Sequence, residues 1–202
     1  MDAKCGRIST IRRNFSVRTA AGIGRRNIRI RETSAGSQVA SQLETTGDQS
    51  IHLRFIERCY ELASASVERG NHPFGALLVL DARVVAESRN EAVTSNDPTR
   101  HAELLVLQTG LPAVAADDHS RITLYSSTEP CAMCTGAAYW SRVGHIVFGC
   151  SARALADAAG ADFLIPSREL LAHGNAPPRV TGPLLEERGR AQHLAYWSTH
   201  RG

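Results

Sequence analysis

Hydrophobic and polar positions divide the chain into two parts near residue 50. Residues 1–49 have no sustained hydrophobic period and are rich in Arg, Ser, Thr, Gly and Ala. Such a segment buries too little apolar surface to offset its ordering entropy, so we predict a disordered extension. After Ile51, apolar residues at positions 56, 59, 63 and 67 recur at helical spacing before Gly70, which predicts a helix over 51–69. We therefore assign residues 1–49 to an extension and residues 50–202 to a folded domain.

Short apolar runs alternate with helical patterns through the rest of the chain. The alternation predicts strands over 74–80, 84–89, 122–126, 145–149 and 179–181. Helices are predicted over 97–108, 130–141, 152–158, 167–173 and 184–197. Asp97-Pro98 and Glu129-Pro130 open the first two of these helices, with proline at the first helical position. This order predicts an α/β layered domain around a mixed sheet.

The charge is unevenly distributed along the chain. The 202 residues carry a net charge of +3, with nine basic and four acidic residues in 1–49 but fourteen basic and sixteen acidic residues in 50–202. The folded part is slightly acidic, which argues against a nucleic-acid partner. The longest apolar runs are too short to span a bilayer, so no membrane partner is expected. The Arg-rich start fits a transit peptide, a weak anionic tether or an extension without function, and these alternatives stay open.

The five cysteines, at positions 5, 59, 131, 134 and 150, do not form a disulfide pattern. Their number is odd, the chain is long enough to form its own core, and no secretory signal precedes the domain. We therefore expect a reducing, cytoplasmic location.

The sharpest local signal is Pro130-Cys131-Ala132-Met133-Cys134. Two thiols three residues apart at a helix start face the same side, where the helix dipole favours thiolates. By itself the pair fits a redox site, half of a structural zinc site or two buried thiols. A thioredoxin-like redox site is disfavoured because two strands and two helices precede the cysteines.

His101-Ala102-Glu103 lies at the start of the preceding helix. One imidazole and two thiolates, from His101, Cys131 and Cys134, make three protein ligands for Zn²⁺ and leave a fourth position for water. Glu103 is close enough to address that water without binding the metal. Both halves follow the H-x-E…P-C-x-x-C pattern of zinc deaminases.

The chemistry expected of such a site is hydrolytic deamination. Zinc lowers the pKa of a water molecule to about 7 and so supplies a nucleophile at neutral pH. Glu103 takes the proton of the water, passes it to a ring nitrogen and then protonates the leaving amine, which departs as ammonia.

Residues 72–150 resemble the cytidine deaminase superfamily, and within it the guanine deaminase branch. The resemblance rests on Pro73-Phe74-Gly75-Ala76, on Asn90, on residues 96–103 and on residues 129–134. It implies a three-layer α/β/α domain with a mixed sheet of about five strands, one Zn²⁺ per subunit and a homodimer. It also implies that Asn90 hydrogen-bonds the substrate ring, and that the backbone at Ala102 and the Phe74-Gly75 turn close the pocket.

Two further regions bear on the substrate through the same resemblance. Tyr139-Trp140 is similar to the guanine deaminases, in which aromatic residues there help to form the pocket and the subunit interface. Residues of the C-terminal region cover the base in that branch, and the candidates here are Asp162, Glu186, Glu187, Tyr196 and Trp197. Trp140 and Asp162 are therefore included in the expected substrate site.

The leading hypothesis is deamination of a free nucleobase or related amino-heterocycle. Guanine, giving xanthine and ammonia, is the favoured substrate, and triazines, isoguanine and azapyrimidines are acceptable analogues. The alternative is a tRNA adenosine deaminase that converts adenosine to inosine, which only the basic N-terminal segment supports. A minor alternative is a non-catalytic, zinc-stabilised interaction module, although it would need a fourth protein ligand and leaves Glu103 unexplained.

Overall fold

The domain is built on a mixed five-stranded sheet. The structure is a computed structural model that describes residues 34–160 and 164–200, with side chains from residue 49 onward. The strands are β1 (Gly75–Leu80), β2 (Arg83–Arg89), β3 (Ile122–Thr128), β4 (His145–Cys150) and β5 (Arg179–Thr181), in the spatial order β2-β1-β3-β4-β5. β1 runs antiparallel to β2 and β3, whereas β3, β4 and β5 are parallel. The predicted mixed sheet of about five strands is confirmed.

The hairpin between β1 and β2 closes through a two-residue turn. Asp81 and Ala82 have φ angles of 49° and 60°, the left-handed pair that matches the twist of a tight hairpin. The parallel strands β3 and β4 need a longer connection, which the helix α3 (Ala132–Trp140) supplies. As a result, the end of β3, the start of α3 and the start of β1 meet at one edge of the sheet.

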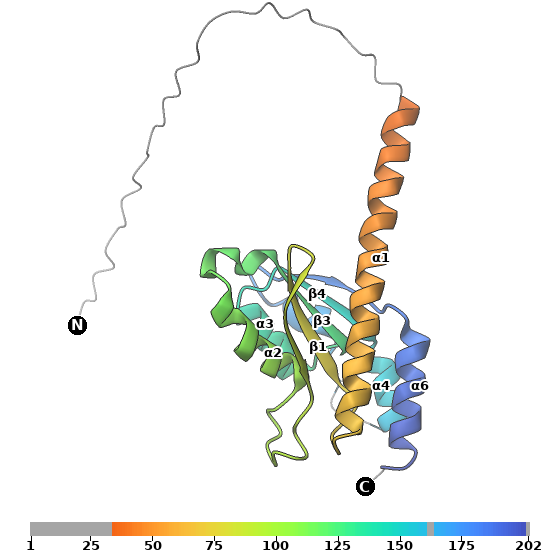
Figure 1. Cartoon of the computed structure of the whole chain (residues 1–202), viewed down its shortest axis with the longest axis vertical. Helices are drawn as coiled ribbons and strands as arrows, with labels where there is room; N and C mark the ends of the chain where they lie inside the picture. The colour runs from red at the N-terminus through yellow and green to blue at the C-terminus, as the bar shows by residue number, and fades with distance from the viewer. Residues whose placement is uncertain (1–33, 161–163, 201–202) are drawn as a thin grey trace, which may run out of the picture.

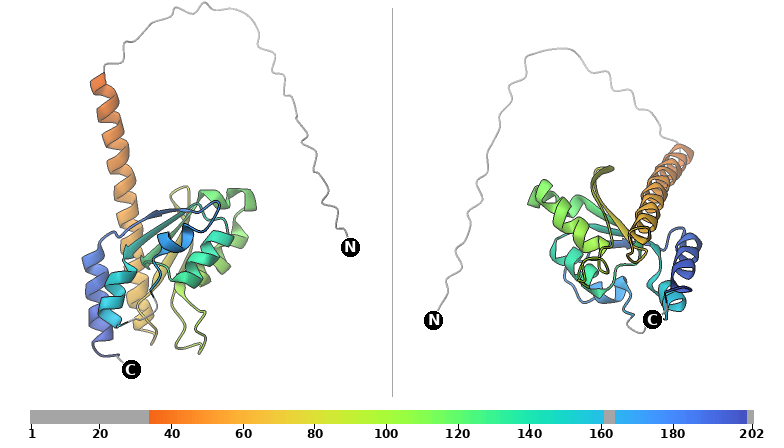
Figure 2. Two further views of the ribbon diagram at one scale, coloured as in Figure 1. Left: turned by 180° about the vertical axis from the view of Figure 1, so that it is seen from behind. Right: turned by 60° about the horizontal axis from the view of Figure 1, so that its bottom comes forward.

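Helices cover both faces of the sheet (Figures 1 and 2). One face carries α2 (Ala102–Gly110), α3 and α5 (Ser167–Leu171). The other carries α1 (Ser34–Val67), α4 (Ala152–Ala159) and α6 (Glu186–Trp197). Two short 3₁₀ turns, Leu111–Ala113 and Ala116–Arg121, lie in the segment predicted to be a loop. The predicted three-layer α/β/α arrangement is confirmed.

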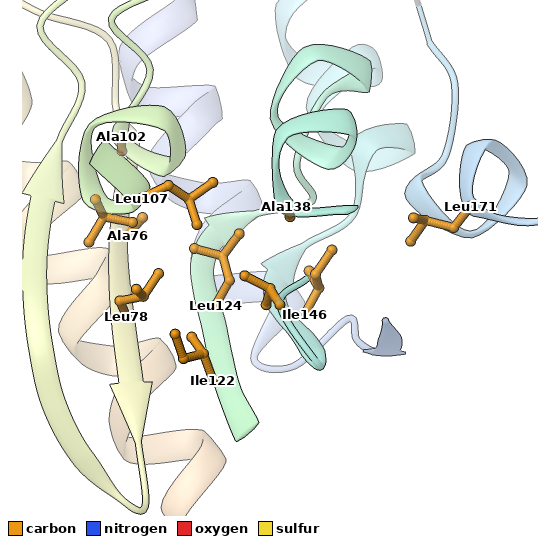
Figure 3. Packing of buried hydrophobic residues seen from close by; sticks show 11 residues of the cluster. Ala76, Leu78, Ala102, Leu107, Ile122, Leu124, Ala138, Ile146 and Leu171 are labelled. Carbon is orange, nitrogen blue, oxygen red and sulfur yellow. The ribbon is translucent and has the colours of Figure 1, made fainter. Parts of the chain in front are cut away.

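Alternation along the central strands separates two cores. Ala76, Leu78 and Leu124 face α2 and α3 (Figure 3), whereas Leu77 and Tyr125 face α1. Every residue of β4 is buried, as expected of a strand covered on both faces. The two layers of helices therefore hold the sheet rigidly from both sides, including the edge at which β3 ends.

Four helix starts differ from the predicted ones, among them that of α6, which begins at Glu186 rather than at residue 184. α2 begins at Ala102, because Asp97 accepts hydrogen bonds from the backbone and hydroxyl of Thr99, at 2.8 and 2.6 Å, and so forms a turn before the helix. α3 begins at Ala132, with Cys131 as its N-cap and Pro130 outside the helix. The predictions that Pro98 and Pro130 occupy first helical positions are therefore wrong by a few residues.

α1 begins at Ser34, well before the predicted start at residue 51. Extending an existing helix costs far less than nucleating one, so a helix packed on the sheet can continue into a segment without a hydrophobic period. The upper part of α1 extends past the sheet (Figure 1). Residues 1–33 lie outside the described residues, so the assignment of 1–49 to a separate extension stays a prediction. Within the described part of the chain, no helix is both long and apolar enough to cross a bilayer.

Candidate active site

Two helix N-termini bring the predicted metal ligands together. His101 is the N-cap of α2 and Cys131 is the N-cap of α3, and both have extended backbone angles. Neither side chain caps its own helix, so both are free to point away from it. Cys134 follows within the first turn of α3 and is fully buried. The positive ends of both helix dipoles therefore face the three side chains.

The three ligand atoms form a compact cluster. Nδ1 of His101 lies 3.7 Å from Sγ of Cys131 and 3.6 Å from Sγ of Cys134. All three ligand atoms lie within 4.8 Å of one another. One imidazole nitrogen and two thiolates are a donor set that Zn²⁺ prefers, and three protein ligands leave one tetrahedral position open. The cluster therefore fits a zinc ion, as the sequence predicts.

Hydrogen bonds within the cluster shift the pKa values of its two cysteines in opposite directions. The Cys134 thiol donates to the sulfur of Cys131, which lowers the pKa of Cys131 to about 4 and raises the pKa of Cys134 above its usual value. The same Cys131 sulfur raises the pKa of His101 by hydrogen bonding to its ring. A metal ion would displace these protons, because a coordinated thiol is deprotonated.

Glu103 lies in the first turn of α2, beside the cluster. Its side chain is 4% exposed, and Oε1 accepts a 2.7 Å hydrogen bond from the hydroxyl of Ser126. Oε2 lies 3.7 Å from Sγ of Cys134, so the carboxyl contacts the cluster without joining it. Burial raises the pKa of Glu103. A carboxyl with a raised pKa, fixed beside a metal site, is suited to taking up and returning protons.

The structure places four of the predicted substrate residues on α2 and on the linked segments around Gly75 and Asn90. Asn90 is 1% exposed; its Oδ1 accepts from the backbone of Ala92, whereas Nδ2 has no hydrogen-bond partner. The backbone N–H of Asn90 donates to the carbonyl of Phe74, which ties the two residues together. Ala102 is buried at the first position of α2. Gly75 packs against α1, because an added Cβ there would meet the Cys59 carbonyl and lie 2.6 Å from Cβ of Leu62.

Two predicted substrate residues are not placed at the cluster. Trp140 is 83% exposed at the last position of α3, about 12 Å along the helix from its start. There it packs edge-on against Tyr139, and the two rings lie between cavities of about 670 and 400 Å³. Asp162 lies outside the described residues.

Three consecutive hydroxyls at the end of β3 organise the site, and sequence reasoning did not select them. Ser126 holds Glu103, and Ser127 accepts a 3.1 Å hydrogen bond from the backbone N–H of Gly75. Thr128 lies 2.8 Å from Nε2 of His193 in α6. A run of three hydroxyls that ends a buried strand, just before Glu129-Pro130-Cys131, is the signal that could have identified them.

Glu129 connects the cysteine loop to two helices. Its Oε2 accepts from the backbone of Ala152, and its Oε1 accepts from the backbone and the hydroxyl of Ser167, at distances between 2.7 and 3.0 Å. These two residues begin α4 and α5, so the carboxylate lies at two helix N-termini. Glu129 therefore fixes the approach of the chain to Cys131 rather than opening a helix.

The end of α6 reaches the same edge of the sheet. His72 Nδ1 lies 3.1 Å from the hydroxyl of Tyr196, and its ring packs 5.1 Å from that of Trp197. Burial lowers the pKa of His72, and the nearby charge of His101 adds to the effect. The two C-terminal aromatic residues considered from the sequence thus come close to the cluster through His72. Glu186, another candidate, instead accepts hydrogen bonds from the backbone and the hydroxyl of Ser151, the N-cap residue of α4.

Sequence relatives place the chain among deaminases. A model of the "Cytidine and deoxycytidylate deaminase zinc-binding region" matches residues 49–150. A "Probable cytosine deaminase" of Schizosaccharomyces pombe is 32% identical over 154 residues, which cover 74% of this chain and 94% of the relative. A "Guanine deaminase" of Bacillus subtilis is 42% identical over 92 residues, covering 45% of this chain and 59% of the relative. A "tRNA-specific adenosine deaminase" of Haemophilus influenzae is 41% identical over 48% of this chain and 57% of its own length.

Solved structures agree on the fold. A structure from a study of "A-to-I Editing by tRNA:A34 Deaminases" superposes with a TM-score of 0.55 at 27% identity, covering 69% of this chain and 98% of the other. A guanine deaminase from Nitrosomonas europaea superposes with a TM-score of 0.62 at 24% identity over 72% of this chain and 84% of its own, which supports the fold alone. With its His101, Cys131 and Cys134 positioned to bind a metal ion, the chain belongs to the zinc-binding cytidine and deoxycytidylate deaminase family.

Proposed function

We propose that this protein hydrolytically deaminates a free nucleobase, with guanine as the favoured substrate, at a zinc ion held by His101, Cys131 and Cys134. The observation that carries the proposal is the position of Glu103. A buried carboxyl held by Ser126 beside a three-ligand cluster has no structural purpose that an uncharged residue would not serve at lower desolvation cost. It does serve a reaction in which a proton must be taken up and returned.

The chain's own residues account for each proton transfer. Zinc, when bound here, supplies a water nucleophile at neutral pH. Glu103 accepts the proton of that water and delivers it to the ring nitrogen of the base. As the water oxygen bonds to the ring carbon, Glu103 would take up the second proton from that oxygen and give it to the amino group, so that the C–N bond breaks and ammonia leaves. Ser126 fixes Oε1 by a hydrogen bond, so Oε2 is the oxygen that moves the protons.

The buried amide of Asn90 supports a planar amino-heterocycle as the substrate. Its Nδ2 is a donor without a partner among the described residues, and a carbonyl oxygen or ring nitrogen of a base would satisfy it. The guanine deaminase of Bacillus subtilis, 42% identical over 92 residues, also supports this choice. Phe74 and Ala102 would line the pocket beside the amide.

A second copy of the chain would cover the exposed Trp140 and fill the two cavities beside it. We propose a homodimer through this end of α3, because Trp140 is 83% exposed between two cavities that also contain Tyr139. A cytoplasmic location also remains part of the proposal.

The relatives support two other substrates. The cytosine deaminase relative aligns over 94% of its own length, which makes cytosine the second candidate. The tRNA adenosine deaminase relatives keep tRNA as a further alternative.

Ammonia release separates these substrates. The zinc-loaded protein is assayed with guanine, guanosine, adenine, cytosine, isoguanine, aminotriazines and an adenosine-containing tRNA anticodon stem, with Glu103→Gln as the blank. Release from guanine that disappears in the variant is the expected result. Release from cytosine or tRNA alone would replace guanine as the substrate, and silence on all of them would overturn the proposal.

A further inference from the structure

His193 contacts both segments that form the metal-binding edge of the sheet, although it lies on α6. It is 1% exposed, its Nε2 lies 2.8 Å from the hydroxyl of Thr128, and its ring centroid lies 5.4 Å from that of Phe74. Thr128 ends β3 three residues before Cys131, and the carbonyl of Phe74 accepts the backbone N–H of Asn90. His193, a single side chain of α6, therefore supports both the loop that leads to Cys131 and the segment that carries Asn90.

Burying the imidazole of His193 at this contact costs free energy of folding that a functional role would explain. The second ring nitrogen of His193, Nδ1, is buried without a hydrogen-bond partner among the described residues. Burial also lowers the pKa of His193 to about 4, so the ring is neutral at physiological pH. An apolar residue would fill the same space without an unsatisfied nitrogen, and a merely structural contact would not require an imidazole.

We propose that His193 is a positioning residue that couples α6 to the substrate pocket. Its hydrogen bond fixes the end of β3, and its ring fixes Phe74 and, through the Phe74 carbonyl, Asn90. The inference rests on the proposed deaminase function and deepens it, because substrate binding then depends on a helix that lacks any catalytic motif. The contacts described for His193 are with Thr128 and Phe74, and those described for Glu103 are with Ser126 and Cys134, so the effect falls on substrate binding rather than on proton transfer.

Four variants test the coupling. His193→Phe keeps a ring against Phe74 but loses the hydrogen bond, and Thr128→Val removes the same bond from the other side. His193→Gln keeps a polar group that can reach Thr128. Gln192→Ala is the matched control, because Gln192 lies next to His193 and ties α6 only to α1, through Tyr60 and Ser64.

The measurements are KM and kcat on the preferred base, zinc per chain and the melting temperature. We expect His193→Phe and Thr128→Val each to raise KM about tenfold, the size of one lost buried hydrogen bond. The kcat value should stay within about threefold, and one zinc should remain bound. The double variant should be no worse than either single variant, His193→Gln should recover most of the loss, and Gln192→Ala should lower the melting temperature with KM unchanged.

The outcomes distinguish a failure of the proposed deaminase function from a failure of the role proposed for His193. A wild-type protein that releases no ammonia from any base contradicts the proposed function and this inference with it. An active wild type whose KM is the same in His193→Phe contradicts the inference alone. So does a KM that rises equally in Gln192→Ala, because general loosening of α6 would then explain the effect.

Discussion

The helices α3 and α6 flank the same edge of the sheet but contribute to it in different ways. α3 brings Cys131 and Cys134 to the cluster from one helical turn. α6 brings His193, Tyr196 and Trp197, which contact Thr128, His72 and Phe74 rather than the cluster itself. The metal ligands and Glu103 therefore come from two short motifs at the starts of α2 and α3, whereas their support comes from α6, much later in the chain.

Removing a ligand from the α3 side has the largest expected effect. Cys134→Ser replaces a fully buried thiolate with a hydroxyl that zinc binds poorly, so the variant should hold no zinc and show no measurable turnover. Metal analysis and ammonia release check this. Cys59→Ala, which removes another fully buried thiol outside the cluster, is the control and should keep one zinc. Zinc retained at full occupancy in Cys134→Ser would contradict the ligand assignment.

Removing the carboxylate of Glu129, which supports the loop before α3, should have the next largest effect. Glu129→Ala leaves the backbone donors of Ala152 and Ser167 without their partner, for a loss of about 3–5 kcal/mol in the free energy of unfolding. Denaturant unfolding measures the loss, and Glu129→Gln should restore part of it. An unchanged unfolding midpoint for Glu129→Ala would show that α4 and α5 hold the loop without the carboxylate.

A pair of glycine substitutions compares the two helix layers directly. Gly75→Ala places a Cβ against α1 and should lower the free energy of unfolding by about 2–3 kcal/mol. The new Cβ would meet the backbone carbonyl of Cys59 and the Cβ of Leu62, and neither atom can move freely. Gly136→Ala in α3 meets nothing within 4 Å and should be neutral or slightly stabilising, since alanine favours helix. Thermal melts of both variants test this, and equal losses would contradict the packing described for Gly75.

The smallest expected effect is on the pH dependence of stability. The pKa of His193 is about 4 in the folded protein, whereas an exposed histidine titrates near 6.5. The unfolded chain therefore binds more protons between these values, and stability falls as the pH falls from 7 towards 4. His193→Gln should remove about 2 kcal/mol of the loss that the wild type shows between pH 7 and pH 5. Parallel pH profiles for the two proteins would mean that His193 is not buried as a neutral ring.

The sequence predicts the strands to within two residues because β1 and β4 are largely apolar runs and turn residues bound the strands. It also predicts the metal cluster, because each of the two motifs that supply the ligands, His101-Ala102-Glu103 and Cys131 to Cys134, has a characteristic local spacing. It misplaces the helix starts, since Asp97-Pro98 satisfies an isolated turn as well as a helix cap.

Contacts between distant segments could not be predicted in this way. Thr128 and His193 are 65 positions apart, and nothing in the pattern near either residue indicates the other. The hydrogen bonds from Ala152 and Ser167 to Glu129 likewise depend on how α4 and α5 pack. Trp140 shows the opposite case, because it is close to the motif in sequence but lies at the far end of the nine-residue helix α3, and its part in the substrate site stays a prediction.

Zinc content and turnover of Glu103→Gln test the central claim most directly, because they separate metal binding from proton transfer. The variant should bind one zinc per chain like the wild type and release ammonia from the preferred base at least about 10²-fold more slowly. A rate equal to that of the wild type, at equal zinc content, would show that Glu103 does not move the protons and would contradict the account.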